Sequence, residues 1–198
     1  GIEPVIREYA WRIIAAAAAL HVLLISVLIS NPLLQPIGVG EWPVFNALLF
    51  AYALPAILAL LFANALGGGR LDGFALPAAV AGLALFFLYL TLETRHWFQG
   101  PMLADGAPDI AEWYAYSLVW LAYGAVLLGL GMALGQQKLR LAGLAIGALV
   151  AVKVFVFDMA ALSGLYRAAS FLGLGASLVG FAYLYQRLIA RARRAGGT

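Results

Sequence analysis

The residues able to do chemistry in this chain are few, and most of them adjoin apolar segments. The 198 residues include 12 Lys and Arg, 9 Asp and Glu, two His and no Cys. Polar groups end or begin four apolar runs, in TLETRHWFQG, EWYAYSLVW, KVFVFD and LYRAAS. We predict that they meet at one membrane level. The candidate site residues are Glu93, Arg95, His96, Glu112, Ser117, Lys153, Asp158, Tyr166, Arg167 and Ser170.

Two kinds of chemistry fit this cluster. Its cations Arg95, Lys153 and Arg167 suit an anionic group, such as a lipid head group, an undecaprenyl-type phosphate or a glycan. Alternatively, its acids and bases pair with one another and clamp the ends of the helices together. Charges inside a bilayer are costly and usually face a partner or a cavity, so both interpretations stay open.

Lys153 is the charge that we expect deepest in the membrane. Asp158 lies five positions further along the same helix, on a different face, so pairing between the two is poor. We therefore expect Lys153 to pair with Glu93 or Glu112, or to extend its side chain toward water.

No metal site, cofactor or catalytic residue is predicted. The absence of Cys excludes thiolate ligands, and His21 and His96 are expected at different depths. The sequence contains no glycine-rich phosphate loop, zinc-ligand spacing or nucleophile elbow. His96 has two interpretations, a hydrogen-bonded structural group or a proton carrier near neutral pH.

The composition requires a lipid environment. Of the residues, 65% are hydrophobic and 11% are charged, whereas soluble domains carry about 25% charged residues. A membrane-spanning helix needs about 20 apolar residues. The sequence predicts an all-α polytopic membrane bundle, one domain over 1–198. Its six transmembrane helices are expected at 11–29, 44–65, 75–92, 113–134, 141–157 and 168–188.

The basic residues predict the orientation of this bundle, because cytoplasmic loops of membrane proteins are enriched in Lys and Arg. Arg95 and Arg167 fall on one side. The other side, which we assign to the cytoplasm together with both termini, carries Arg7, Arg12, Arg70, Lys138, Arg140, Arg187, Arg191, Arg193 and Arg194. We therefore predict a multi-pass protein of the bacterial cytoplasmic (inner) membrane, and we reject nucleic acid as a partner.

Small residues predict close helix packing, since lipid supplies no hydrophobic drive between helices. One row is Gly143, Gly147 and Ala151, and another is Ala125, Gly129 and Ala133. The short GQQKLR connection predicts that the helices carrying these rows are antiparallel neighbours. An aromatic stripe in the fourth helix, from Trp113 to Tyr123, is interpreted as packing rather than as a ligand cage.

Several stretches resemble a bacterial family of multi-pass membrane proteins, domain of unknown function 2339. They are NPLL, VGEWPVFNALLFAYALPA, LETRHWFQG, EWYAYSLVW, LRLAGLAIGALVAVKVFVFD and LSGLYRAASFLGLGASLVGFAYLYQR. The resemblance implies that the chain is the C-terminal part of a larger protein with a hydrophilic N-terminal region. It lends no established activity. Its motif positions include Glu93, Arg95, His96, Lys153, Asp158, Tyr166 and Arg167.

Three functions are compatible with the sequence. The first is a non-catalytic scaffold or interaction module of a cell-envelope assembly, whose partners are membrane lipids, other membrane subunits or a lipid-linked glycan. The second is a transporter or flippase-like component, which would contain a water-filled cavity. The third is a membrane enzyme acting on a lipid-linked substrate with Glu93 or His96 as base. The scaffold is preferred, because broken helices are not evident apart from Pro55.

Overall fold

The computed structural model describes residues 14, 18, 21–66, 72–158, 172–173, 175–176, 178–183 and 185–187. Within these residues the chain is all-α, and its single β feature is an isolated bridge between Gly38 and Met102. The chain divides into two compact units, Gly1–Tyr123 and Gly124–Thr198, and each is described by itself.

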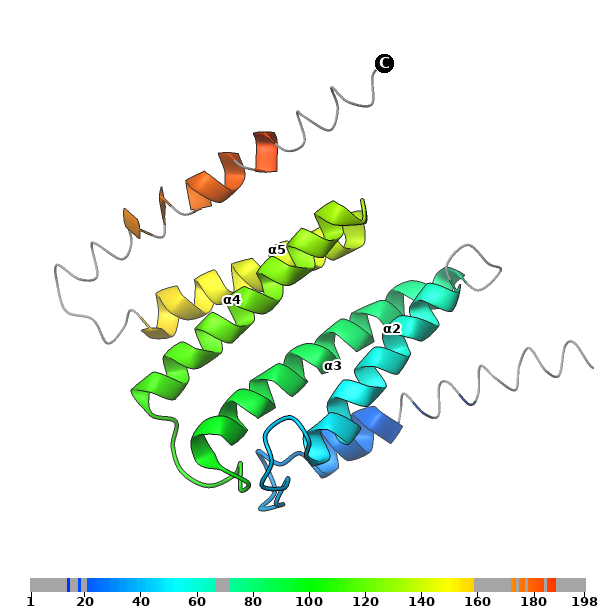
Figure 1. Cartoon of the computed structure of the whole chain (residues 1–198), viewed down its shortest axis with the longest axis vertical. Coiled ribbons are helices and arrows are strands. Elements are labelled where there is room, and N and C mark those ends of the chain that lie inside the picture. The colour runs from blue at the N-terminus through cyan, green and yellow to red at the C-terminus, as the bar shows by residue number, and fades with distance from the viewer. Residues whose placement is uncertain are drawn as a thin grey trace, which may run out of the picture. The chain divides into compact units, whose positions relative to one another are not determined.

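The helices follow the apolar segments of the sequence (Figure 1). The first unit contains the π-helices η1 (Val22–Ile29) and η2 (Leu49–Ala53), followed by α2 (Leu54–Leu66) and α3 (Asp72–Gln99). α4 (Ile110–Ala133) begins in the first unit and ends in the second. α5 (Gln137–Lys153) and the π-helix η3 (Val154–Asp158) belong to the second.

Four helical segments are long and apolar enough to cross a membrane. They are Leu49–Leu66, Phe74–Gln99, Ile110–Ala133 and Gln137–Val156. They match the segments predicted at 44–65, 75–92, 113–134 and 141–157. The segments predicted at 11–29 and 168–188 lie largely outside the described residues, so six crossings and the position of the termini stay predictions.

Two helix boundaries differ from the prediction for the same physical reason. Helical structure begins at Ala47, just before η2, rather than at 44, and α3 continues to Gln99 rather than ending at 92. The prediction followed apolar character alone. Polar residues extend α3 because their side chains find partners in nearby loops, and the residues before Leu49 are held by those same partners.

The proline expected to kink the second helix lies where its hydrogen-bond pattern changes. Leu54 donates its N–H to the carbonyl of Leu49, five residues earlier, and Pro55 follows directly. Because proline has no N–H, a carbonyl of the preceding turn loses its donor there. The π-to-α change at Pro55 is consistent with that loss. A second helical proline, Pro77, lies inside α3, which begins at Asp72.

α2 and α3 lie side by side in the first unit (Figure 1). Their closest approach is at Gly82, where an added Cβ would lie 2.7 Å from Leu60 Cγ and 2.9 Å from the carbonyl oxygen of Ala56. Next to this pair, the core residues come from η2, from α3 and from the two neighbouring loop segments. They are Val39, Leu48, Tyr52, Ala53, Tyr89, Leu92 and Leu103.

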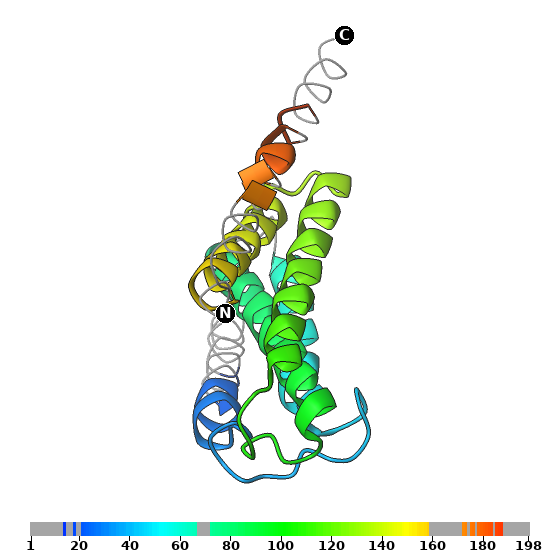
Figure 2. The same ribbon diagram turned by 90° about the vertical axis from the view of Figure 1, so that its left-hand side faces the viewer.

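In the second unit, α5 packs against the last part of α4 through glycines. An added Cβ on Gly143 would lie 2.7 Å from both the carbonyl oxygen of Gly124 and the amide nitrogen of Leu128. By contrast, an added Cβ on Gly129 or Gly147 meets no atom of the described residues within 4 Å. The antiparallel pairing predicted from the short connection is confirmed (Figure 2). On α4 it is Gly124 and Gly131, rather than the predicted row through Gly129, that lie against α5.

This contact gives a matched pair of substitutions. Gly143→Ala places a methyl group against backbone atoms, and we expect it to lower the free energy of unfolding by about 1–3 kcal/mol. Gly147→Ala is the control, because it makes the same change on the same helix in open space. The measurement is unfolding of both variants in detergent. Equal stability would contradict the close approach of α4 and α5 at Gly143.

Candidate functional site

The polar cluster of the first unit lies where α3 ends and α4 begins. α3 has 28 residues, which at 1.5 Å per residue gives a length of about 42 Å. A bilayer core is about 30 Å thick. The last turns of α3 can therefore reach beyond the hydrocarbon, and they carry Glu93, Arg95, His96 and Gln99. Glu112 lies in the first turn of α4.

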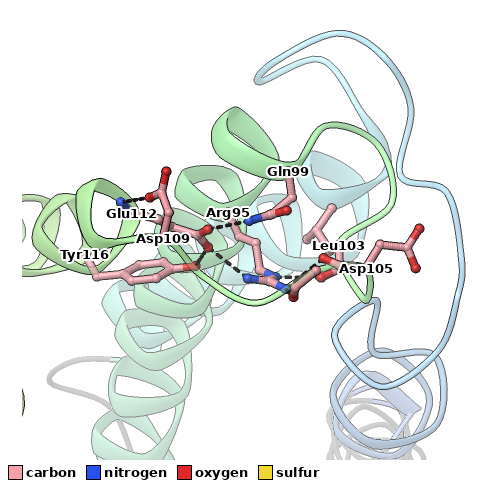
Figure 3. A network of polar contacts seen from close by, with 8 residues as sticks. Arg95, Gln99, Leu103, Asp105, Asp109, Glu112 and Tyr116 are labelled. Atoms are coloured by element: carbon pink, nitrogen blue, oxygen red, sulfur yellow. Dashed lines mark hydrogen bonds and ion pairs between the residues drawn. The ribbon is translucent and has the colours of Figure 1, made fainter.

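Arg95 is held by four hydrogen bonds (Figure 3). Its Nη1 lies 2.9 Å from Glu112 Oε1, an ion pair whose side chains are 10% and 0% exposed. Its Nε donates to the carbonyl of Leu103 at 2.6 Å. Its Nη2 donates to the carbonyls of Asp105 and Gly106, at 3.2 and 2.9 Å. The guanidinium thus ties the α3–α4 connection to the end of α3.

Glu112 is equally engaged. Besides Arg95, its carboxylate accepts hydrogen bonds from Gln99 Nε2 at 2.7 Å and from the Tyr116 hydroxyl at 2.5 Å. Its own N–H donates to Asp109 Oδ1 at 2.7 Å, so Asp109 caps the start of α4. Gly106 completes this arrangement, because it has φ +72° and an added Cβ would lie 2.9 Å from Gln99 Oε1. Few residues other than glycine tolerate that backbone conformation.

Glu93 and His96 fasten a different segment, the loop before η2. Glu93 Oε1 accepts from Asn46 Nδ2 at 2.7 Å, and Oε2 accepts from the Val44 amide at 3.3 Å. His96 Nε2 lies 2.8 Å from the carbonyl oxygen of Gly40. The second ring nitrogen, Nδ1, lies 3.7 Å from Glu93 Oε2 and is buried without a hydrogen-bond partner in the part of the chain that is described.

The two loops fastened by α3 also contact each other. Residues 31–48 and 100–109 are called the loop layer from here on. Within it, the Val39 amide donates to the carbonyl of Pro101 at 2.9 Å, next to the bridge between Gly38 and Met102. Leu103 is fully buried in the core below. The loop layer is therefore an ordered structure with its own contacts.

This geometry resembles a clamp more than an open binding site. A buried ion pair is costly unless hydrogen bonds satisfy its remaining groups, and here most of them are satisfied within the protein. The guanidinium bonds Glu112 and three loop carbonyls, while the carboxylate has three side-chain donors. The Arg95 guanidinium and the Glu112 carboxylate therefore direct their hydrogen bonds to groups within the protein rather than to an incoming anion or proton.

The structure brings together four of the ten predicted site residues: Glu93, Arg95, His96 and Glu112. Ser117 lies further along α4 and is half-buried. Lys153 belongs to the second unit, where it is 6% exposed at the junction of α5 and η3, so its pairing with Glu93 or Glu112 stays a prediction. The side chain of Asp158 is not described, and Tyr166, Arg167 and Ser170 lie outside the described residues.

Sequence reasoning missed most partners of these groups. The Asp109–Glu112 spacing is a recognisable helix-start signal, yet Asp109 was not selected. Asn46 and Gly40 had no such signal, because nothing in the sequence indicates that the loop before η2 lies against α3. The carbonyl partners of Arg95 are equally invisible, since every residue carries a backbone carbonyl.

The aromatic stripe of α4 packs against α3 within the first unit. The rings of Trp120 and Phe87 have centroids 4.9 Å apart, and Trp120 Nε1 donates to Thr91 Oγ1 at 3.0 Å. The Tyr123 hydroxyl donates to the carbonyl of Leu83. These contacts support the packing interpretation. Among the described residues, no group of three His, Asp or Glu side chains is arranged to hold a metal ion.

The chain belongs to the family described as "Predicted membrane protein (DUF2339)", whose model matches residues 2–188. No curated protein and no solved structure matches it at a significant level. The resemblance drawn from the sequence motifs is thereby confirmed, and the chain is a multi-pass integral membrane protein. The family description carries no specific function, so any function rests on the geometry of the site.

The Arg95–Glu112 pair gives a stability prediction. Arg95→Met leaves Glu112 buried without its counter-ion, and Glu112→Gln does the same to Arg95, so each should cost about 3–5 kcal/mol of unfolding free energy. The double variant should cost less than the sum by at least about 1 kcal/mol, because the pair is coupled.

The control for this cycle is Glu41→Gln, an exposed acid of the same loop layer. It should change stability by no more than about 0.5 kcal/mol. Unfolding of all variants in one detergent measures the cycle. Additive losses for the double variant would show that the two groups do not interact.

Proposed function

We propose that this chain is a non-catalytic scaffold module of a cell-envelope assembly. In this proposal it crosses the bacterial cytoplasmic membrane six times with both termini in the cytoplasm. The loop layer then lies on the periplasmic face. The module holds that layer in one conformation, so that other membrane subunits can bind it.

The observation that carries the proposal is the engagement of Arg95 and Glu112. A site that binds or transforms a substrate keeps charged groups available for it, and it offers a cleft with an unpaired acid beside a base. Here the cation and the acid bond each other and the loops, with almost no exposure. Such an arrangement fixes structure, which is what a scaffold requires.

The groups named for the enzyme alternative also bond the loop layer, through every side-chain nitrogen and oxygen except His96 Nδ1. Both carboxylate oxygens of Glu93 accept hydrogen bonds from the loop layer, and His96 Nε2 bonds the carbonyl of Gly40. These contacts make Glu93 and His96 positioning groups for a loop. They favour the scaffold over a lipid-modifying enzyme with either residue as base.

The surface offered to a partner is aromatic and apolar. Trp42 and Phe45 are 76% and 79% exposed in the loop layer, and Trp97 and Ile110 are similarly exposed at the neighbouring helix ends. Exposed aromatic residues are enriched in protein interfaces and at membrane surfaces. Another membrane subunit is the proposed partner, with membrane lipids or a lipid-linked glycan as the alternatives.

The orientation rests on charge. The start of α5, directly after the α4–α5 connection, carries Lys138 and Arg140, whereas the loop layer carries Glu41, Asp105 and Asp109. α4 separates these two regions by one crossing. By the positive-inside rule, the connection lies in the cytoplasm and the loop layer outside.

The absence of cysteine makes a direct test possible. Single variants Asp105→Cys and Gln136→Cys place a thiol at an exposed position at either end of α4. A membrane-impermeant thiol crosslinker applied to spheroplasts should join Asp105→Cys to one discrete membrane protein. It should leave Gln136→Cys unmodified until the membrane is opened.

A third variant separates the scaffold from a transporter. Ala56 is fully buried in α2, so Ala56→Cys should resist water-soluble thiol reagents in native membranes. Rapid modification of Ala56→Cys would reveal a water-filled path and favour the transporter. The scaffold proposal fails if Asp105→Cys yields no discrete crosslink in membranes of the producing organism. Labelling of Gln136→Cys from outside would contradict the proposed orientation in the membrane but not the scaffold role.

A further inference from the structure

Glu93, Arg95, His96 and Glu112 fasten the loops, and among their described side chains the one buried polar atom without a hydrogen-bond partner is Nδ1 of His96. The residue is 3% exposed, and Nδ1 has no hydrogen-bond partner in the described part of the chain. It faces Glu93 Oε2 at 3.7 Å, beyond the 2.7–3.2 Å of a normal N–H···O bond. Buried polar groups are nearly always satisfied, so this atom requires an explanation.

The hydrogen bond of the other ring nitrogen, Nε2, determines which nitrogen of the neutral imidazole carries the hydrogen. Nε2 lies 2.8 Å from the carbonyl oxygen of Gly40. A carbonyl can only accept, so Nε2 must carry a hydrogen and donate it. In the neutral ring, Nδ1 is then a bare acceptor that faces a carboxylate oxygen, which is also an acceptor. Only a proton on Nδ1 turns this contact into a favourable one.

We propose that His96 and Glu93 form a proton-binding site that fastens the segment 40–46 of the loop layer. Binding of a proton to Nδ1 lets the imidazolium donate to Glu93 Oε2, closing the 3.7 Å gap into a charge-assisted hydrogen bond. The structure shows the pair in its open form. This inference does not depend on the proposed scaffold function.

The segment 40–46 is strained, and within the described part of the chain it is bonded to this site and to its own loop. Val44 has φ +69°, which is a true outlier for a β-branched residue. Its amide and the Asn46 side chain bond Glu93, and the Gly40 carbonyl bonds His96. The Glu93 and His96 side chains therefore bind residues at both ends of the turn. A hydrogen bond between the two side chains links these two attachments.

The charged groups near His96 favour this assignment. On its own helix these are Glu93 and Arg95; Glu41 lies in the loop before η2, Asp105 and Asp109 in the loop 100–109, and Glu112 on α4. Arg95 is neutralised by Glu112, and Glu41 is exposed. Glu93 is the charge that contacts the ring, and histidine is the side chain that titrates between pH 5 and 8.

The direction of the effect follows from the proton count. At low pH, Nδ1 carries its proton, the pair is closed and the turn is held. At higher pH the proton leaves Nδ1, and two acceptors then face each other. The turn that exposes Trp42 and Phe45 is then held less firmly, because the bond between His96 and Glu93 is lost.

A nitroxide label tests this in the full chain, because Phe45→Cys supplies the only thiol at an exposed position of the turn. In detergent, the ratio of mobile to immobile label should rise roughly tenfold between pH 5.5 and 8, as expected for loss of a charge-assisted bond. The same label at Asp105→Cys is the control, and it should not respond, because Arg95 holds that loop.

Substitutions of His96 and Glu93 test whether this pair causes the pH response of the label. His96→Gln retains a donor toward Gly40 but cannot be charged, so its label should show no pH response. Glu93→Gln removes the acceptor charge and should flatten the response in the same way, which covers the case in which His96→Gln fails to fold. A label at position 45 that is insensitive to pH in the parent would overturn the proposal. So would a full response in either variant.

Discussion

A guanidinium that leaves water must be met by protein groups, and the end of α3 is arranged around that requirement. Arg95 is nearly buried, and its counter-charge Glu112 is fully buried. The free-energy cost of removing both charges from water exceeds the free energy of their attraction unless further hydrogen bonds form. Those bonds come from three carbonyls of the α3–α4 connection, from Gln99 and from Tyr116. The connection is thus shaped by the ion pair it surrounds.

The consequences reach beyond the pair itself. Because the connection is held, Leu103 can enter the core and Pro101 can accept from Val39 in the other loop. That second loop is fastened independently by Glu93 and His96. Polar residues on about two turns of one helix therefore order two segments that are far apart in the sequence. Their side chains explain why α3 extends past its apolar stretch.

The sequence predicted the parts of this structure that depend on hydrophobicity and missed those that depend on pairing. Apolar length was sufficient to locate the four membrane helices, and charge in an apolar context was sufficient to select Glu93, Arg95, His96 and Glu112. Neither apolar length nor charge reveals that Asn46 and the Gly40 carbonyl are the partners of Glu93 and His96, since a long loop has no periodicity that fixes its position. Small-residue spacing likewise did not reveal that Gly124 and Gly131, rather than Gly129, lie against α5.

Hydrogen exchange at the Val39 amide tests most directly whether the Arg95–Glu112 pair holds the loop layer in place. Val39 bonds Pro101 across the two loops, whereas the hydrogen bonds of Arg95 go to other residues. Measured by NMR in detergent, this amide should exchange slowly in the parent chain. It should lose most of that protection in Arg95→Met while amides in the middle of α3 keep theirs. Unprotected exchange at Val39 in the parent, or unchanged protection in Arg95→Met, would contradict the account.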